Sequence, residues 1–233
     1  YQNGGFFINE GTFENEGALS NFGSAHLINE ASGNLINRAG ASITNFGTIT
    51  NTGAVLNEGN ILNTAILNND GVIQNESFIQ NGITAQFNNN ATGVILNNGA
   101  FEMGGFFNNS GTFINEATVV VNSSGTLTND GEFQNLLDFS NNSGLVDNNG
   151  HFVNAGVLNN NFGGIINNYG NFENVLGTLE IFECSFLYQY SQIYPIAGNV
   201  WNFGVIYILG APVNYMPMTG SVELYSLEDP QPE

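Results

Sequence analysis

A parallel β-solenoid (β-helix), with short hexapeptide-like repeats, is the all-β architecture expected for this chain of 233 residues. Three features predict it: a repeat of about six residues, Gly or Asn at the bend of each repeat, and strand-forming residues at its apolar position. The composition agrees, because 42 asparagines and 30 glycines occur in a chain with only 9% charged residues. Ordinary globular domains carry about 25% charged residues.

The repeat reads apolar, any, Asn, any, Gly, any, and it recurs from Phe7 to Asn174. Phe13-Glu14-Asn15-Glu16-Gly17 is one unit, and Val55-Leu56-Asn57-Glu58-Gly59 is another. The apolar and Asn positions lie two residues apart, so in an extended chain both side chains point to the same side. A helix would spread such a repeat around its axis and would be destabilised by its Gly and Asn residues. Each unit is therefore expected to form a short strand followed by a bend.

Successive strands are expected to be the sides of a coil, with parallel strands stacked about 4.8 Å apart. Three sides are favoured, which uses roughly 18 to 22 residues for each coil and gives about nine coils. The apolar side chains of Phe13, Ile49, Phe113 and Phe152 are predicted to lie inside. The sequence does not reveal the handedness of the coil.

The repeat asparagine is expected to point into the coil and to bond its equivalents in the neighbouring coils. A buried amide without a partner would cost about 1–3 kcal/mol, so a hydrogen-bonded ladder is nearly compulsory. Only Met103 clearly replaces the repeat Asn, and we expect a local irregularity there. The predicted ladder residues include Asn15, Asn21, Asn51, Asn57, Asn115 and Asn154.

The composition changes at Thr178. Residues 178–233 contain all five prolines, the only Trp, six of the eight tyrosines and the only cysteine, Cys184. Residues 1–177 are therefore assigned to the Asn/Gly-rich solenoid, and residues 178–233 to a distinct C-terminal β cap or subunit-contact segment. Cys184 has apolar neighbours and is predicted to be a buried thiol. A single cysteine excludes a disulfide framework within this chain.

The charge of the chain excludes several classes of function. The net charge is -19, with no Lys and with Arg38 as the single cation. Nucleic-acid binding, binding to an anionic membrane surface and a polysaccharide lyase all require more cationic groups. No run approaches the ~18 apolar residues of a membrane span. The chain starts at Tyr1 without Met, so either a leader has been removed or the chain is a fragment.

Acidic residues follow the repeat asparagine at many bends, where they are expected to face solvent. A solvated acidic surface is the favoured interpretation, and Ca²⁺ sites formed by aligned carboxylates are the alternative. A glycosidase would need two carboxylates that face each other across a cleft, and four residues outside the bend position are the candidates to inspect. His26 and His151 lack metal-ligand spacing. No catalytic, cofactor-binding or metal-ligating residue is predicted. The bend residues are Glu10, Glu16, Glu30, Glu58, Glu76, Glu116, Asp70 and Asp130; the four candidates are Glu102, Asp138, Asp147 and Glu173.

The units Asn-Glu-Gly-Thr-Phe, Asn-Phe-Gly-Thr-Ile-Thr-Asn and Asn-Asp-Gly resemble the Asn/Gly-rich β-solenoid repeats of secreted bacterial surface proteins and adhesins. The resemblance covers residues 1–177. It implies export, an extracellular or cell-surface location and a structural or adhesive role, and it supplies no catalytic residues. Two non-enzymatic functions follow: a structural protein that assembles with copies of itself into a filament or coat, or an adhesin or stalk that binds cell-surface or environmental glycans.

Self-assembly is favoured by three features. The repeat begins almost at once, at Phe6, Phe7 and Ile8, so the first strands are a template for another chain. Outward positions are apolar in several units, and the C-terminal segment is rich in the amphipathic aromatic residues common at interfaces. We therefore expect head-to-tail contacts that give an open filament. The outward residues are Ile8, Ile28, Ile36, Leu56, Leu62, Leu96 and Ile114; the candidate contacts are Phe6, Phe7, Ile8, Tyr188, Tyr190, Trp201 and Tyr207.

Overall fold

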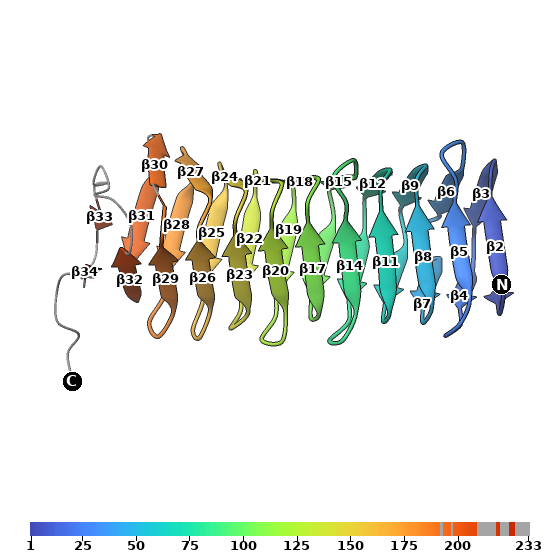
Figure 1. Cartoon of the computed structure of the whole chain (residues 1–233), viewed down its shortest axis with the longest axis horizontal. Coiled ribbons are helices and arrows are strands. Elements are labelled where there is room, and N and C mark those ends of the chain that lie inside the picture. The colour runs from blue at the N-terminus through green and yellow to red at the C-terminus, as the bar shows by residue number, and fades with distance from the viewer. Residues whose placement is uncertain (192, 197, 209–217, 220–223, 227–233) are drawn as a thin grey trace.

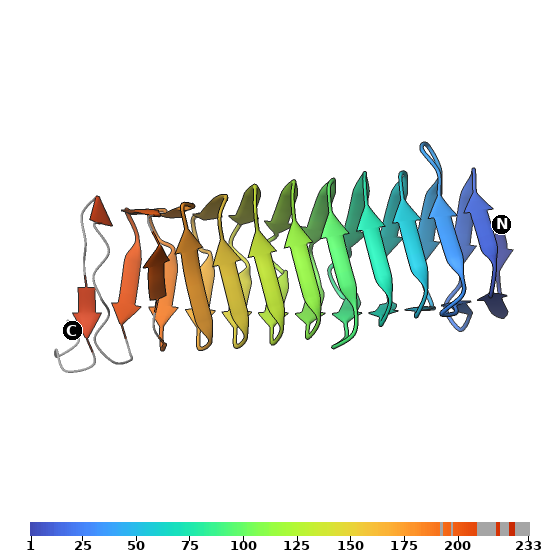
Figure 2. The same ribbon diagram turned by 90° about the horizontal axis from the view of Figure 1, so that it is seen from above.

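The chain folds into one elongated three-sided coil, which Figures 1 and 2 show from two directions. The computed structural model describes residues 1–191, 193–196, 198–208, 218–219 and 224–226. All regular elements in these residues are β-strands, and the strand pairs are parallel. The predicted parallel β-solenoid is confirmed. Within the same residues no helix is long and apolar enough to cross a membrane.

Each side of the coil is one sheet, and every third strand along the chain joins the same sheet. Sheet A contains β1 (Gln2–Asn3), β4 (Ala18–Asn21), β7 (Ser42–Asn45), β10 (Asn60–Asn63), β13 (Phe78–Asn81), β16 (Ala100–Met103), β19 (Thr118–Val121), β22 (Asp138–Asn141), β25 (Val157–Asn160), β28 (Thr178–Ile181), β31 (Asn199–Asn202) and β33 (Met218–Thr219).

Sheet B contains β2 (Phe6–Asn9), β5 (His26–Asn29), β8 (Thr48–Asn51), β11 (Ile66–Asn69), β14 (Gln86–Asn89), β17 (Phe106–Asn109), β20 (Thr126–Asn129), β23 (Leu145–Asn148), β26 (Ile165–Asn168), β29 (Phe186–Gln189), β32 (Val205–Ile208) and β34 (Leu224–Ser226). Sheet C contains β3 (Thr12–Asn15), β6 (Asn34–Asn37), β9 (Ala54–Asn57), β12 (Val72–Asn75), β15 (Val94–Asn97), β18 (Thr112–Asn115), β21 (Glu132–Asn135), β24 (His151–Asn154), β27 (Asn171–Val175) and β30 (Ile193–Ile196).

The three-sided coil agrees with the favoured prediction, and so does the number of coils in the repeat region, because the strands from β1 to β27 form nine coils. The sheets then continue beyond the repeat, and within the described residues sheets A and B reach twelve strands and sheet C ten. Coil length varies from 18 residues, between Asn3 and Asn21, to 24 residues, between Asn21 and Asn45. The additional residues lie in the bends, so the strands keep the same register throughout.

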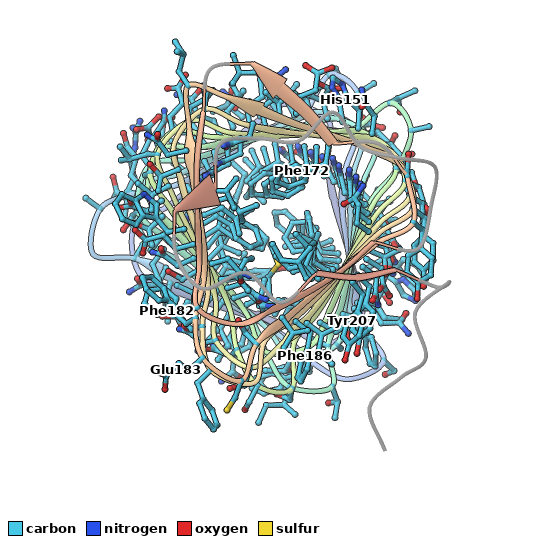
Figure 3. All side chains as sticks on the ribbon, turned by 90° about the vertical axis from the view of Figure 1, so that its left-hand side faces the viewer. His151, Phe172, Phe182, Glu183, Phe186 and Tyr207 are labelled. Carbon is cyan, nitrogen blue, oxygen red and sulfur yellow. The ribbon has the colours of Figure 1, made fainter. Side chains whose placement is uncertain are left out.

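The core is a continuous column of inward side chains. Along each strand the second and fourth residues point inward, and the second is the apolar residue of the repeat. Ile49, Phe113 and Phe152 are buried as predicted, whereas Phe13 is only partly buried, because the first coil has a stacked neighbour on one side. The view along the coil axis in Figure 3 shows Phe172 inside, with His151 and Tyr207 outside.

The core changes character along the coil. Its N-terminal half is lined mainly by Ile, Leu and Val, and a residual cavity of about 10 Å³ lies between them. Further along, Phe113, Phe133, Phe152 and Phe172 stack on one another in sheet C, with ring centroids 4.7, 4.7 and 5.3 Å apart. Because the strands pair in register, equivalent Phe side chains lie directly above one another and their rings are near-parallel.

The sheets continue past Thr178. β28 pairs with β25 and β31, and β29 pairs with β26 and β32, all in the same register as the preceding coils. What changes at Thr178 is therefore the composition of the side chains. A separate cap or subunit-contact segment at residues 178–233 stays a prediction, and much of its last part lies outside the described residues.

Glycines at the bends allow the coils to approach closely. A Cβ added to Gly131, at the bend between sheets B and C, would lie 2.2 Å from the carbonyl oxygen of Gly111 in the preceding coil. Gly11 occupies the same bend in the first coil and has no such neighbour within 4 Å. The glycine is thus required by the stacking of coils.

We expect Gly131→Ala to destabilise the protein by about 1–3 kcal/mol, because the backbone of a neighbouring coil must move to accept the methyl group. Gly11→Ala is the matched control and should change stability by less than about 0.5 kcal/mol. Urea denaturation followed by circular dichroism measures both. Equal effects of the two substitutions would contradict the role given to close stacking.

Candidate functional site

The most extensive polar arrangement in the molecule is the inner asparagine ladder, the column of buried Asn side chains that end the strands of each sheet. The Nδ2 group of one asparagine donates to the Oδ1 of the asparagine in the next coil, over 2.6 to 2.8 Å. In all three sheets the donor belongs to the coil nearer the N-terminus. The predicted residues Asn15, Asn21, Asn51, Asn57, Asn115 and Asn154 are all buried members, so the ladder is confirmed.

Each inner amide also connects two sides of the coil. Asn57 Nδ2, at the end of β9 in sheet C, donates to Asn75 Oδ1 over 2.8 Å and to the carbonyl of Phe78 over 3.0 Å. Phe78 begins β13 in sheet A. Asn115 makes the equivalent bonds, to Asn135 and to the carbonyl of Asp138. The ladder therefore holds the bends as well as the stack.

The ladder of sheet A is interrupted at two successive strands, β16 and β19, and again at Ile181 in β28. Met103 pairs with Val121, and both are fully buried in unbroken register, so the irregularity expected at Met103 is absent. The flanking amides find backbone partners instead: Asn81 Nδ2 donates to the Phe106 carbonyl over 2.9 Å, and Asn141 Oδ1 accepts from the Gly144 N–H over 3.0 Å. Two apolar neighbours can thus replace two amides without disturbing the strands.

The acidic side chains lie on the outside of the coil. The eight bend carboxylates are exposed or partly exposed, as predicted. The four glycosidase candidates are not brought together: Glu102 and Asp138 lie in sheet A with β19 between their strands, Asp147 lies in sheet B and Glu173 in sheet C. Among the described residues no group of three acidic, His or Cys side chains is arranged to hold a metal ion. Calcium binding stays a prediction.

Arg38 occupies the bend between sheets C and A and joins three coils. Its guanidinium donates to Glu14 over 2.8 Å and to Glu58 over 3.3 Å. The hydrogen bond with Glu14, and then the one with Glu58, raise the pKa of Arg38 above its usual value. The single cationic side chain of the sequence is therefore already paired.

His151 lies on the outer face of sheet C between two carboxylates. Its Nδ1 is 2.8 Å from Glu132 and its Nε2 is 3.3 Å from Glu173. The two carboxylates contact opposite edges of the imidazole, so they cannot converge on one metal ion. His26 is also on an outer strand face, where its ring stacks on Phe6 with centroids 5.0 Å apart. Both histidines are strand-surface residues, as expected from the sequence.

The candidate contact residues lie mainly on the flanks of the coil. Tyr188 and Tyr207 stack on the outer face of sheet B, with centroids 4.9 Å apart, and burial raises the pKa of Tyr188. Tyr190 stacks on Tyr169 at the bend between sheets B and C, with centroids 4.3 Å apart. Their role as subunit contacts stays a prediction. Of the other candidates, Phe6, Ile8 and Trp201 are exposed on outer faces, and Phe7 packs on Phe13 in the first coil.

Cys184 is exposed, so the predicted buried thiol is wrong. The residue lies in the bend after β28, in a left-handed conformation with φ of 59°. Its apolar sequence neighbours, Phe182 and Phe186, themselves lie in a bend and at an outward strand position, and they do not build a core around it. Apolar neighbours in the sequence were therefore a misleading sign of burial for this residue.

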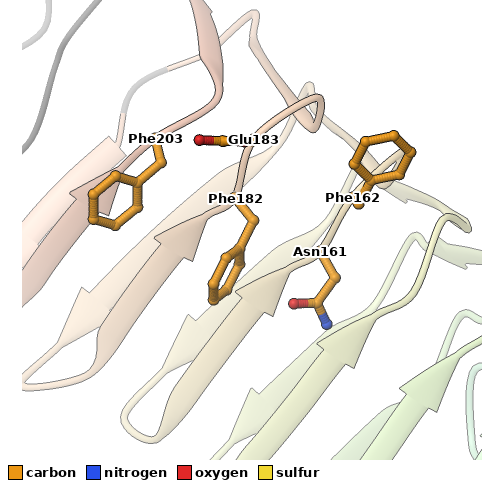
Figure 4. A pocket seen from close by; sticks show the side chains of 5 residues that line it. All are labelled: Asn161, Phe162, Phe182, Glu183 and Phe203. Carbon is orange, nitrogen blue, oxygen red and sulfur yellow. The ribbon is translucent and has the colours of Figure 1, made fainter.

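Sequence reasoning missed a pocket at the bend between sheets A and B, shown in Figure 4. Its lining residues are Asn161, Phe162, Phe182, Glu183 and Phe203, and its volume is about 480 Å³. The available signal was the Asn-Phe-Gly triplet, which puts a Phe in this bend at Phe162 and Phe203. The stacking of these bends in successive coils was not evident from sequence spacing.

No protein-family model and no curated protein matches this chain. Among solved structures, a hyper-glycosylated fragment of TibA, whose glycosylation is catalysed by TibC, is similar. The identity is 15%, the match covers 97% of this chain and 90% of that chain, and the TM-score is 0.48. A similarity this low leaves the function of this chain to be inferred from its own residues.

We expect Asn57→Leu to destabilise the protein by about 1–3 kcal/mol, because Asn75 Oδ1 loses its donor inside the coil. Asn68→Leu is the matched control: Asn68 is one of the outward asparagines of sheet B and is partly exposed. This control should change stability by less than about 0.5 kcal/mol. Thermal and urea denaturation test both. An Asn57→Leu protein as stable as the wild type would refute the energetic role of the ladder.

Proposed function

We propose that this chain is a non-enzymatic structural rod of the extracellular space or cell surface, which extends by head-to-tail stacking of copies. The observation that carries the proposal is the common polarity of the three inner ladders. Every donor amide points toward the C-terminal end and every acceptor oxygen toward the N-terminal end. Such a stack gains its strength from each added coil, which suits a load-bearing rod.

The first coil supports the assembly part of the proposal. β1, β2 and β3 each pair with another strand on one side only. The Oδ1 atoms of Asn3, Asn9 and Asn15 accept only from the N–H of the nearby bend glycines, over 3.2 to 3.4 Å. A further coil with the same repeat would donate its amides to these oxygens and pair with the three strands.

The location rests on the resemblance of the repeat to secreted bacterial surface proteins and on the surface chemistry. A net charge of -19 with one paired cation keeps such a rod soluble and discourages sideways association with copies of itself. Charge repulsion opposes end-to-end contact less, because the buried side chains of the described strands are neutral asparagines and apolar residues. The net charge thus favours end-to-end growth of the rod over side-by-side association of rods.

Sedimentation velocity over a concentration series, with negative-stain electron microscopy, tests the assembly. We expect the wild-type protein to form filaments at high concentration and Ile8→Glu to prevent them, because Ile8 is exposed in the first coil. The control is Ile66→Glu, which places the same charge on the outer face of sheet B away from the first coil. A wild-type protein that sediments as a monomer at every concentration would refute head-to-tail assembly.

A glycan-binding stalk is the second candidate, and the outer face of sheet B favours it. Asn108 donates to Asn88 over 2.9 Å and Asn88 to Asn68 over 2.8 Å, which forms a partly exposed amide column. The Tyr188–Tyr207 stack lies further along the same face, with β20, β23 and β26 in between. Amides and aromatic rings are the groups that hold sugar hydroxyls and ring faces. Binding to immobilised neutral polysaccharides that is lost in Asn88→Ala, and kept in Asn98→Ala at the bend between sheets C and A, would support it.

A further inference from the structure

The pocket in Figure 4 is a groove between three successive bends that join sheets A and B. We call it the corner groove, and it is lined by Asn161, Phe162, Phe182, Glu183 and Phe203. Its volume of about 480 Å³ is in the range of small-ligand pockets. The three phenyl rings come from the bends of three different coils, and all three line the groove.

The bends that form the groove are held in place by hydrogen bonds between coils. The Gly163 N–H donates to the Cys184 carbonyl over 3.0 Å, and both residues have left-handed backbones. The Ser185 hydroxyl donates to the carbonyl of Phe182 over 2.7 Å. The Phe203 N–H donates to the carbonyl of Ile181 in the preceding coil over 2.7 Å. The phenyl groups are therefore attached to a fixed backbone, which lowers the entropic cost of binding.

The polar atoms available in the groove are acceptors. The Nδ2 group of Asn161 donates to Asn142 over 2.6 Å, which leaves its Oδ1 to accept a hydrogen bond. Glu183 adds a carboxylate, and within the described residues it has no ion-pair partner and no donor. Ring faces are attractive to cations because of their quadrupole. Phenyl rings with a carboxylate and an amide oxygen match a group that has positive charge and several N–H donors.

The net charge of the whole chain limits which ligands can bind in the corner groove. A net charge of -19 repels anionic ligands and attracts cations to the groove. The side chains of a second copy of this chain do not supply such a cation, because the sequence has no Lys and its one Arg is paired with Glu14 and Glu58. The ammonium group of Tyr1 is also engaged, since it donates to the Ala18 carbonyl. The occupant is therefore a different molecule.

We propose that the corner groove binds a primary ammonium group, the side chain of a lysine presented by a basic partner protein. The alkyl chain packs on the phenyl rings, and the ammonium group donates to Glu183 and to Asn161 Oδ1. A quaternary ammonium lacks N–H donors and leaves both acceptors unused. The groove accepts this ligand in an isolated rod as well as in an assembled one, so the proposal does not depend on filament formation.

Isothermal titration of the full chain with Nα-acetyl-lysine amide tests the site. We expect binding that weakens as NaCl is added, because charge attraction is screened by salt. Glu183→Gln and Phe182→Leu should each weaken it about tenfold, since either a charge or a cation–π contact is lost. The control variants are Glu116→Gln, at another bend, and Phe46→Leu, which alters the Asn-Phe-Gly bend near the opposite end of the rod. Both should bind like the wild type, and circular dichroism confirms that all four variants fold.

Three further probes identify the ligand chemistry. Nα-acetyl-norleucine amide keeps the alkyl chain without the charge and should not bind. If it binds equally well, the groove is merely apolar and the proposal fails. Tighter binding of choline would overturn the assignment to a primary ammonium. Binding of methyl glucoside without binding of the lysine analogue would replace the proposal with a sugar site, and unchanged affinity in Glu183→Gln and Phe182→Leu would place the binding elsewhere.

Discussion

An inner asparagine has to meet the amide of the next coil, and this one hydrogen bond constrains the rest of the structure. A shift of one residue along a strand would turn the asparagine to solvent and bring an outward residue inside. All insertions are therefore absorbed in bends, as where four residues, 22–25, replace the two-residue bend at Thr64 and Ala65. The strands stay in register across coils of 18 and of 24 residues. The glycines at the bends between sheets B and C follow from the same constraint, because the coils stack too closely there for a Cβ.

The constraint is that each buried polar group needs a hydrogen-bond partner. It does not require an asparagine at every position of the ladder. Met103 and Val121 contact each other across adjacent strands, so the gap in the ladder contains apolar groups on both sides. The amides that border the gap bond to backbone groups of their own bends or of the next coil. A buried polar group is costly only when it is left unpaired, so the ladder tolerates a matched apolar pair. The single replacement at Ile181, between Asn160 and Asn202, is compensated in the same way: Asn160 Nδ2 donates to the Phe186 carbonyl, and Asn202 Oδ1 accepts from the Gly204 N–H.

The sequence alone was sufficient for the strands, the inward positions and the ladder, because these depend on a local period. It was not sufficient for anything that depends on which units stack. Glu132 and His151 are 19 residues apart, and only the true coil length shows that they are neighbours. The corner groove was missed for the same reason, since Phe162, Phe182 and Phe203 lie in stacked bends of unequal length. Cys184 was misplaced because burial was inferred from its apolar sequence neighbours, whereas the residue lies in an exposed bend.

Because the inward positions hold the coils together and carry apolar residues or asparagine, charged and other chemically distinct side chains occur mainly at the outward strand positions and in the bends. The three sides use this freedom differently. Sheet C places Leu96 and Ile114 side by side in an apolar stripe, sheet B has its column of amides, and the bend between sheets A and B presents the corner groove. These surfaces face different directions around one rigid axis, as Figure 3 illustrates for Phe182 and His151. A partner bound on one side therefore leaves the others accessible, and a change on one side leaves the ladder intact. The same stacking that limits the interior allows the sides to acquire binding properties independently.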